Sequence, residues 1–198
     1  EFSLDTLPPF PYSEEDLQLA KQNGEMVVLR AGAFRFDGQN NPITIINFRD
    51  FFRVDPVGKL PTVFYSFRKD ANDWYATQNF ATQPGEIQLG WSIVKKELLP
   101  GSTNKKWQQQ EDVLQAYGKE LAQKRAKNTQ VRRRTATEAV WDSLLYYTTN
   151  QEQLLPSVVD WTSSSASDGY LVGVGYFVSN GLLVVRWDSD EAGPRIGV

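Results

Sequence analysis

Hydrophobic and polar positions change period several times along the first half of the chain, which indicates several short elements. Residues 26–30 form an apolar run typical of a buried strand, and the β-branched and aromatic run 63–67 predicts another. Residues 88–98 predict a third strand, closed by Pro100-Gly101. The stretch 44–52 is apolar enough to pack, but its period does not separate strand from helix.

Capping signals predict further helices. Ser13 precedes three acidic residues and predicts the start of a short helix that ends at Gly24. A longer helix is expected over residues 103–127. Thr135 has Glu138 three positions on, which is the spacing of a capping box at the start of another helix. The expected apolar positions of the two longer helices are Trp107, Val113, Leu114, Tyr117, Leu121, Val140, Trp141, Leu144, Leu145 and Tyr147.

The pattern becomes rich in strands after Pro156. Residues 161–168 predict a serine-rich loop and residues 171–178 a strand. Asn180-Gly181 is a type I′ hairpin signal, and residues 182–187 would form the partner strand. A polar loop then leads to the apolar stub 196–198.

Turn signals separate the earlier elements, at Asp37-Gly38, at residues 40–42 and at residues 69–73. We therefore expect a single α+β domain over residues 1–198, with two or three helices and a mixed, mostly antiparallel sheet.

Composition narrows the chemistry. The chain has no Cys and no His, which excludes thiol nucleophiles, disulfides, Ser-His-Asp triads and zinc sites made from these residues. No nucleotide-binding glycine motif is present, and we find no EF-hand spacing. Carboxylate, Lys, Tyr or Ser–Lys chemistry and oxygen-ligated Ca²⁺ or Mg²⁺ remain open. Because so many mechanisms are removed, we expect a protein that is not an enzyme, with no catalytic residues, no metal and no cofactor.

Net charge and hydropathy bear on partners. The formal net charge is −3, whereas general nucleic-acid binders usually carry a basic excess, so we expect no nucleic-acid partner. No apolar run approaches the roughly 20 residues of a membrane-spanning helix. The first residues carry no secretory-signal pattern, and localisation stays open.

A basic cluster surrounds the turn between the two longer helices. We expect these cations to oppose the helix dipole and stay solvated, while a grip on phosphate or an acidic partner is the alternative. The cluster consists of Lys124, Arg125, Lys127, Arg132, Arg133 and Arg134.

Acidic and aromatic residues offer two further candidates. Asp188, Asp190 and Glu191, with Asp160 and Asp168 upstream, have the oxygen ligands of a Ca²⁺ site, but an acidic surface loop is the expectation. Most of the six Trp residues are expected in the core. Trp161 and Trp187 border the last hairpin and are the two expected to frame a site.

The last part of the chain has an unusual composition. Lys and Gln recur up to Gln153 and are absent after it. Strands disfavour Lys, but the polar loops of this segment would tolerate both residues well. Its polar residues are instead Ser, Asp, Asn, Tyr, Arg and Gly.

Several motifs of this region resemble a known family. They are residues 135–147, Leu154-Leu155-Pro156, Asp160-Trp161-Thr162, the strand 171–177, Asn180-Gly181, Trp187 and Ile196-Gly197-Val198. Together they resemble the C-terminal half of the variable proteins diversified by diversity-generating retroelements, in a version closest to archaeal or candidate-phylum bacterial members. Residues 14–17, 27–30 and 90–94 are similar as well. Many members continue past Gly-Val with a Ser-Phe-Ser-Arg-like tail, and this sequence ends at Val198, which leaves the closing strand open.

The resemblance implies a C-type lectin fold of the type shared with formylglycine-generating enzymes. In this family a reverse transcriptase substitutes at template adenines, mostly in AAC codons, which cannot reach Lys or Gln. The resemblance therefore implies a variable region over residues 162–198. Its framework would be Leu171, Val172, Val174, Gly175, Phe177, Gly181, Trp187 and residues 196–198, with Asn180 in either class.

Glu191, which such codons cannot reach either, would also belong to the framework. Twelve other positions of this region would be diversified and would bind the ligand. Tyr, Ser, Gly and Asp suit adaptable binding surfaces, and Val178, Leu183 and Val185 would make this surface partly apolar. The implied ligand-binding positions are Asp168, Tyr170, Gly173, Tyr176, Val178, Leu183, Val185, Arg186, Asp188, Ala192, Gly193 and Arg195.

The resemblance and the residues together predict a monomeric binding protein whose ligand is a protein or a cell-surface molecule. Two alternatives stay open. One is a conventional calcium-independent lectin with a fixed site, and the other is a structural module of the tail-fibre kind. A formylglycine-generating activity needs Cys ligands, which the chain lacks.

Overall fold

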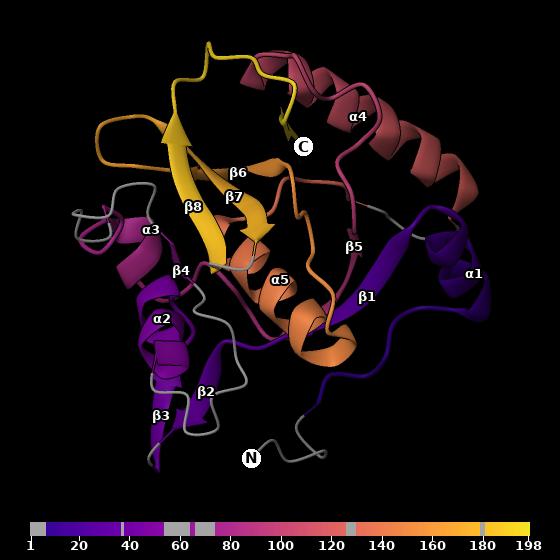
Figure 1. Ribbon diagram of the computed structural model, residues 1–198. Coiled ribbons are helices and arrows are strands. Elements are labelled where there is room, and N and C mark those ends of the chain that lie inside the picture. Colours follow the sequence, from indigo (N-terminus) through magenta and orange to yellow (C-terminus); the bar gives the residue numbers. More distant parts are fainter. Residues whose placement is uncertain (1–6, 37, 54–63, 66–73, 126–129, 179–180) are drawn as a thin grey trace.

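The computed structural model describes residues 7–36, 38–53, 64–65, 74–125, 130–178 and 181–198. These residues form an α+β structure built around helix α5 (Figure 1). In chain order its elements are α1 (Glu14–Gln22), β1 (Glu25–Arg30), β2 (Ala33–Phe36), β3 (Gln39–Pro42), α2 (Ile45–Arg53), β4 (Phe64–Tyr65), α3 (Asn79–Thr82), β5 (Gly90–Lys95), α4 (Trp107–Lys124), α5 (Ala136–Asn150), β6 (Val159–Ser165), β7 (Leu171–Val178), β8 (Gly181–Trp187) and β9 (Ile196–Gly197).

The strands form one larger sheet and two pairs. The larger sheet has the order β4-β8-β7-β6-β9, in which β6, β7 and β8 are antiparallel neighbours and the two short outer strands run parallel to theirs. Strands β1 and β5 form one antiparallel pair, and β2 and β3 form another. The mostly antiparallel α+β prediction is therefore confirmed.

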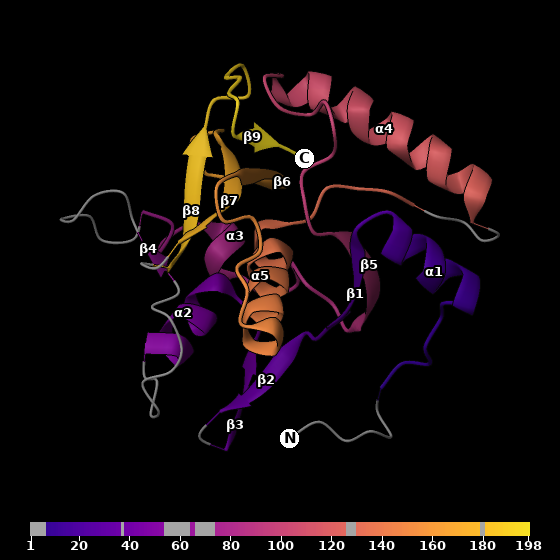
Figure 2. The same ribbon diagram turned by 45° about the vertical axis from the view of Figure 1, so that its right-hand side comes forward.

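Helix α5 is the centre of the core. Its first nine residues are buried except for Trp141, which is half-buried, so almost the whole circumference of this half of the helix is covered. Val140 and Leu144 belong to the same core cluster as Val172 and Phe177 of β7. The views in Figures 1 and 2 place α5 beneath the β6–β8 strands, with β1 and the α2–α3 region on its other sides. The helix thus joins the larger sheet to β1 of the β1–β5 pair and to α2 and α3.

Strands β7 and β8 separate two apolar clusters. Leu182 and Val184 face the main core, whereas the alternate residues Leu183 and Val185 pack with Val159 of β6 in a second, smaller cluster. Tyr176 and Trp187 pack against this second cluster. Successive side chains of a strand point to opposite faces, so the two clusters lie on opposite faces of the sheet.

A bulge in β7 redirects Tyr176. The β7–β8 register shifts between Gly175 and Val178, and Tyr176 takes a left-handed conformation with φ of 49°. The Tyr176 N–H donates to Val158 O at 2.7 Å. Gly175 has φ of 152°, and a Cβ there would lie 2.3 Å from Val158 O, so the approach of the two strands requires glycine.

A buried ion-pair network connects β1, α5 and β6. Arg30 of β1 contacts Glu138 at 2.6 Å and Asp142 at 2.7 Å, both on α5, and its side chain is only 5% exposed. Arg134 contacts the same Asp142 at 3.4 Å and Asp160 of β6 at 2.6 Å. A buried charge is tolerated only when it is paired, so these contacts fix how the three elements meet.

The neighbouring arginines extend this network. Arg132 pairs with Glu138 at 2.6 Å. Arg133 is buried, donates to the carbonyl oxygens of Trp161 and Trp107 at 3.1 and 3.0 Å, and pairs with Glu111 at 3.1 Å. The expectation that the basic cluster between residues 124 and 134 stays solvated is therefore wrong for Arg133 and Arg134, which are tied into the interior. It is also wrong for Arg125, whose side chain is only 8% exposed and pairs with Glu25. The phosphate-binding alternative also fails for the Arg133 and Arg134 guanidinium groups, because buried acceptors already occupy them.

Several predicted elements have different boundaries. The structure contains five helices in its described part, not two or three, because α2 and α3 were not recognised. Helix α2 begins where Thr44 Oγ1 accepts the Asn47 N–H at 3.1 Å, which is a capping contact. Helix α4 begins at Trp107 rather than residue 103, because the Asn104 and Trp107 N–H groups bond to the carbonyl oxygens of Gly193 and Ser189.

Two predicted loops are strands. Residues 40–42 lie in β3 and not in a turn. Residues 161–165 lie in β6, although they were expected in a serine-rich loop. Thr162 donates to Val172 O of β7 at 2.7 Å, and Ser164 Oγ accepts the N–H of Ala136, the first residue of α5, at 3.0 Å. Hydroxyls that favoured a loop are therefore satisfied by a neighbouring strand and by a helix.

Other expectations are confirmed. The capping boxes at Ser13 and Thr135 are both present. The closing segment forms β9, which pairs parallel with β6. The predicted turns at residues 69–73 and Asn180 lie outside the described residues, as does Asp37 of the first turn. No helix in the described part of the chain is long and apolar enough to span a membrane.

We expect Asp142→Asn to destabilise the fold strongly. The substitution keeps the shape of the side chain but removes the charge that faces Arg30 and Arg134, and breaking a buried pair typically costs about 3–5 kcal/mol. Urea denaturation of the wild type and of the variant measures the difference. Asp112→Asn, on the exposed side of α4, is the matched control, and an equal loss in both variants would contradict the role given to Asp142.

The network also predicts a loss of stability in acid. Burial alone would raise the pKa of Glu138, but the hydrogen bond from Arg132, the Arg30 charge and the Thr135 N–H together hold this pKa below its ordinary value. A carboxyl with a lowered folded pKa stabilises the protein above its unfolded pKa, and this stability disappears as the pH falls through the folded value. The difference in unfolding free energy between wild type and Glu138→Gln should therefore shrink between pH 7 and pH 3. A constant difference would refute the ion-pair role.

Candidate functional site

The structure distributes the predicted ligand-binding positions over exposed, half-buried and buried places. Tyr176 and Gly193 are half-buried, and Gly173, Leu183 and Val185 are buried. The side chain of Val178 lies outside the described part. The exposed positions are Asp168, Tyr170, Arg186, Asp188, Ala192 and Arg195.

One group of exposed residues gathers beside the end of β8. The Arg186 guanidinium lies 5.1 Å from the Trp74 ring centroid and 5.8 Å from the Tyr170 ring centroid. It also pairs with the Asp168 carboxylate. The Tyr170 side chain is among the few large hydrophobic groups that remain exposed, at 41%. We name Trp74, Asp168, Tyr170 and Arg186 the Arg186 cluster.

Each member of the Arg186 cluster is positioned by the fold. The Trp74 indole N–H donates to Val184 O at 3.0 Å, which fixes this ring against the edge of β8. Tyr170 and Arg186 flank the first β7–β8 pairing, Leu171 with Trp187. The cation lies over aromatic faces, an arrangement worth about 0.5–1 kcal/mol at an exposed site. The cluster is therefore a preformed, amphipathic feature of the surface.

A second group contains Tyr176 and Arg195. Arg195 donates to the Tyr176 hydroxyl at 2.8 Å, and its guanidinium lies 5.8 Å from the ring centroid. The β7 bulge places Tyr176 against the second apolar cluster, whereas Trp74 of the Arg186 cluster packs against the main core. The predicted surface is thus divided between the two faces of the sheet and does not form one patch.

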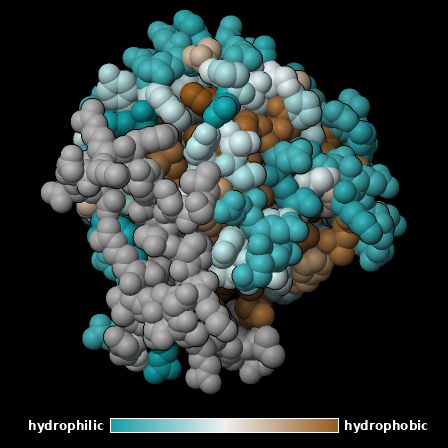
Figure 3. Space-filling view, viewed as in Figure 1, coloured by the Kyte–Doolittle hydropathy of each residue, from teal (hydrophilic) through white to brown (hydrophobic). Residues whose placement is uncertain are grey.

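The buried positions correct the expectation of a partly apolar surface. Leu183 and Val185 are 3% and 7% exposed and pack with Val159. A Cβ at Gly173 would lie 2.6 Å from Val159 Cγ1, so a larger residue there needs the sheet to adjust. Seen from the side of Figure 1, the upper and right-hand margins of the described part are mainly hydrophilic, and hydrophobic atoms gather in smaller patches between them (Figure 3). Leu183 and Val185 are therefore apolar because they fill the second apolar cluster, and they do not form an open surface.

Comparisons of the chain with protein-family models, with curated proteins and with solved structures find no match.

The two Trp residues expected to frame a site lie differently. Trp161 is fully buried, which contradicts this expectation for it. Trp187 is half-buried against the second apolar cluster. The sequence could not distinguish them because both border the last hairpin in sequence. The aromatic residue that does reach the site, Trp74, comes from a distant part of the chain.

The acidic residues considered as calcium ligands are dispersed. Asp160 is buried against Arg134, and Asp168 pairs with Arg186. Asp188 Oδ1 accepts the Asp190 N–H, and Asp190 also contacts Lys106 at 3.1 Å. Within the described ranges, no group of three or more acidic side chains is arranged to hold a metal ion.

Two concave features were missed by the sequence analysis. The first, which we name the α4 pocket, has a volume of about 500 Å³ and lies between β5, α4 and the segment 130–134. The second, which we name the serine groove, has a volume of about 570 Å³ and lies between the α3 region and residues 163–167. Their walls come from segments far apart in the sequence, and only the serine run gave a local signal.

We expect Leu183→Ala and Tyr170→Ala to differ sharply in stability. Leu183 is a core residue, so its truncation should cost about 2–5 kcal/mol, whereas an exposed site usually changes stability by less than about 0.5 kcal/mol. Chemical denaturation of both variants gives the comparison. Equal stability of the two would mean that Leu183 is a free surface position, as the resemblance implies.

Proposed function

We propose that this chain is a non-enzymatic binding protein that displays the Arg186 cluster to a protein or cell-surface ligand. The arrangement of Arg186 over Trp74 and Tyr170 is the observation that carries this proposal. Trp, Tyr and Arg are the residue types that dominate binding hot spots, because each combines a large contact area with a directional polar group. Here Tyr170 and Arg186 are exposed, and the half-buried Trp74 ring joins them to the main core.

The charges of the cluster indicate how a ligand would engage it. Arg186 is paired with Asp168, and both side chains keep more than a third of their surface exposed, at 43% and 37%. A carboxylate of the ligand can approach the guanidinium beside Asp168, while an apolar group contacts the Tyr170 ring. A protein surface supplies both groups, and this favours a macromolecular ligand.

We further propose that the chain is a retroelement-diversified variable protein with a C-type lectin fold. The absence of Lys and Gln after Gln153 supports this, and so do the buried framework residues Val172, Val174 and Phe177. Six of the proposed variable positions are exposed, which suits changeable side chains on a fixed scaffold. The burial of Gly173, Leu183 and Val185 argues for assigning these three positions to the framework.

A library experiment tests this division of positions. Codons that sample the AAC-derived residues are placed at Asp168, Tyr170, Arg186, Asp188, Ala192 and Arg195, and the proteins are displayed on yeast. We expect most members to remain protease-resistant, because these side chains are exposed. A matched library at Gly173, Leu183 and Val185 should lose most of its resistant members.

The same surface library also tests binding. Selection against an immobilised protein such as lysozyme should enrich binders whose contacts map to the Arg186 cluster. Selected clones that bind through unchanged parts of the chain would contradict the proposed surface.

The DNA around the gene gives an independent test. The gene should be followed by a near-identical repeat of its last part that differs at adenines, with a reverse transcriptase gene nearby. A search of the complete neighbouring DNA that finds neither would exclude diversification.

The serine groove favours a second candidate, a fixed lectin-like site. Ser163, Ser165 and Ser167 are exposed beside the Asn79 and Gln83 side chains, a donor and acceptor set that suits sugar hydroxyls. A glycan array distinguishes the two proposals. Binding to a defined glycan that Ser165→Ala weakens and Arg186→Ala leaves unchanged would favour the groove.

A further inference from the structure

The α4 pocket has the dimensions and walls of a small-molecule site. Its volume of about 500 Å³ lies in the range of about 300–1,000 Å³ typical of ligand pockets. Leu114, Tyr117 and Leu121 line it from one side of α4, and Trp91 of β5 and Val131 also contribute. These residues supply aliphatic and aromatic surface for an apolar ligand body.

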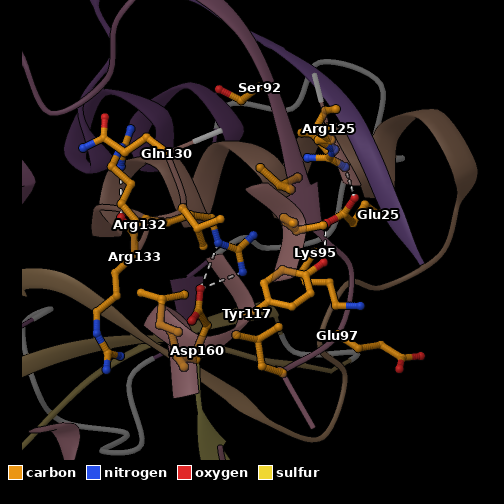
Figure 4. A pocket seen from close by; sticks show the side chains of 18 of the residues that line it. Glu25, Ser92, Lys95, Glu97, Tyr117, Arg125, Gln130, Arg132, Arg133 and Asp160 are labelled. Atoms are coloured by element: carbon orange, nitrogen blue, oxygen red, sulfur yellow. Dashed lines mark hydrogen bonds and ion pairs between the residues drawn. The ribbon is translucent and has the colours of Figure 1, made fainter. Parts of the chain in front are cut away.

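A buried polar group lies at one end of this pocket. Arg125 donates to the Glu25 carboxylate at 2.5 Å, and the Tyr117 hydroxyl donates to the other oxygen of Glu25 at 2.5 Å. The Arg125 and Glu25 side chains are only 8% and 4% exposed. Figure 4 shows Glu25 and Arg125 together on one side, Tyr117 beside them, and Asp160 across the cavity. Burial and the hydrogen bond to Glu25 raise the pKa of Tyr117, so the phenol stays a donor.

One donor in this group is unsatisfied. The Nε atom of Arg125 is buried and has no hydrogen-bond partner, although Arg125 lines the pocket. A buried N–H without an acceptor destabilises a protein, and such groups are rare in native structures. Because Nε has almost no accessible surface in this conformation, an oxygen atom bound in the pocket would satisfy it after a small shift of the Arg125 side chain.

The other charges of the pocket restrict the ligand. Arg30 and Arg134 are held by Glu138, Asp142 and Asp160. Arg125 itself is neutralised by Glu25. Lys95 also lines the pocket, and its ammonium donates to the Asn23 carbonyl oxygen and pairs with no carboxylate of the described residues. The described part of the pocket therefore offers one cation without a carboxylate partner and one free donor, Arg125 Nε, beside an apolar wall.

We infer that the α4 pocket binds a small amphipathic molecule with a flat apolar body and a single acceptor group, a carbonyl or carboxylate, that meets Arg125 Nε. The apolar body lies against Leu114 and Leu121, and the aromatic rings of Trp91 and Tyr117 border it. This site lies between β5 and α4, whereas the Arg186 cluster lies beside β8 (Figure 2). The inference does not depend on the proposed function.

Calorimetric titration with 2-naphthoate tests this inference. We expect saturable binding with one molecule per chain, and binding of 2-naphthylmethylammonium at least tenfold weaker, because the latter presents a cationic donor to Arg125. Arg125→Lys keeps a cation for Glu25 but removes the Nε donor, and it should weaken 2-naphthoate binding about tenfold. Equal affinity for the two probes would overturn the polar half of the inference.

Two pocket-filling variants test the apolar half. Leu121→Trp and Leu114→Trp place an indole in the cavity and should abolish 2-naphthoate binding, with near-ultraviolet circular dichroism showing which variants keep the fold. Leu89→Trp is the matched control, since Leu89 is exposed and lies outside the pocket, and its affinity should stay at the wild-type value. Two outcomes would overturn the inference. One is undetectable binding of 2-naphthoate to the wild type, which would mean that only ordered water occupies the cavity. The other is unchanged binding of 2-naphthoate in a pocket-filling variant that keeps the fold.

Discussion

The fold depends on a buried network of ion pairs around the first half of α5. Arg30 and Arg134 approach this helix from β1 and from the segment before it, and Asp142 accepts both. Asp160 extends the contact to β6. Apolar packing alone tolerates small shifts of one element against another, but paired charges in a dry interior do not. This network therefore fixes the orientation of the larger sheet relative to the rest of the protein.

The sequence predicted the elements whose signals are local. The caps at Ser13 and Thr135 and the strand over residues 171–178 follow from neighbouring residues, and each is present. Strand β6 could not be predicted in this way, because its Ser and Thr hydroxyls are satisfied by partners distant in sequence, on β7, at the start of α5, at Glu86 and at Arg134. The same holds for Arg133 and Arg134, whose run of charge resembles a solvated loop until distant acceptors surround it.

The candidate site was predicted in part. Exposure at Tyr170, Arg186 and Arg195 agrees with a surface role, and these residues were found through composition and resemblance. Leu183 and Val185 were misplaced because a strand that is buried on both faces loses the alternation that would reveal its inner side. Trp74 was missed because it is more than one hundred residues from Arg186 in sequence, and only the fold brings its ring to the guanidinium.

The position of Arg186 over two rings has a kinetic consequence. A long side chain usually loses several rotational degrees of freedom when a partner immobilises it, and this loss weakens the complex. Here the Trp74 and Tyr170 rings and the Asp168 carboxylate already restrict those rotations in the free protein. Under the proposed function, an encounter with a ligand would therefore need little rearrangement at this point. Differences among ligands would then appear mainly as differences in how long each complex lasts.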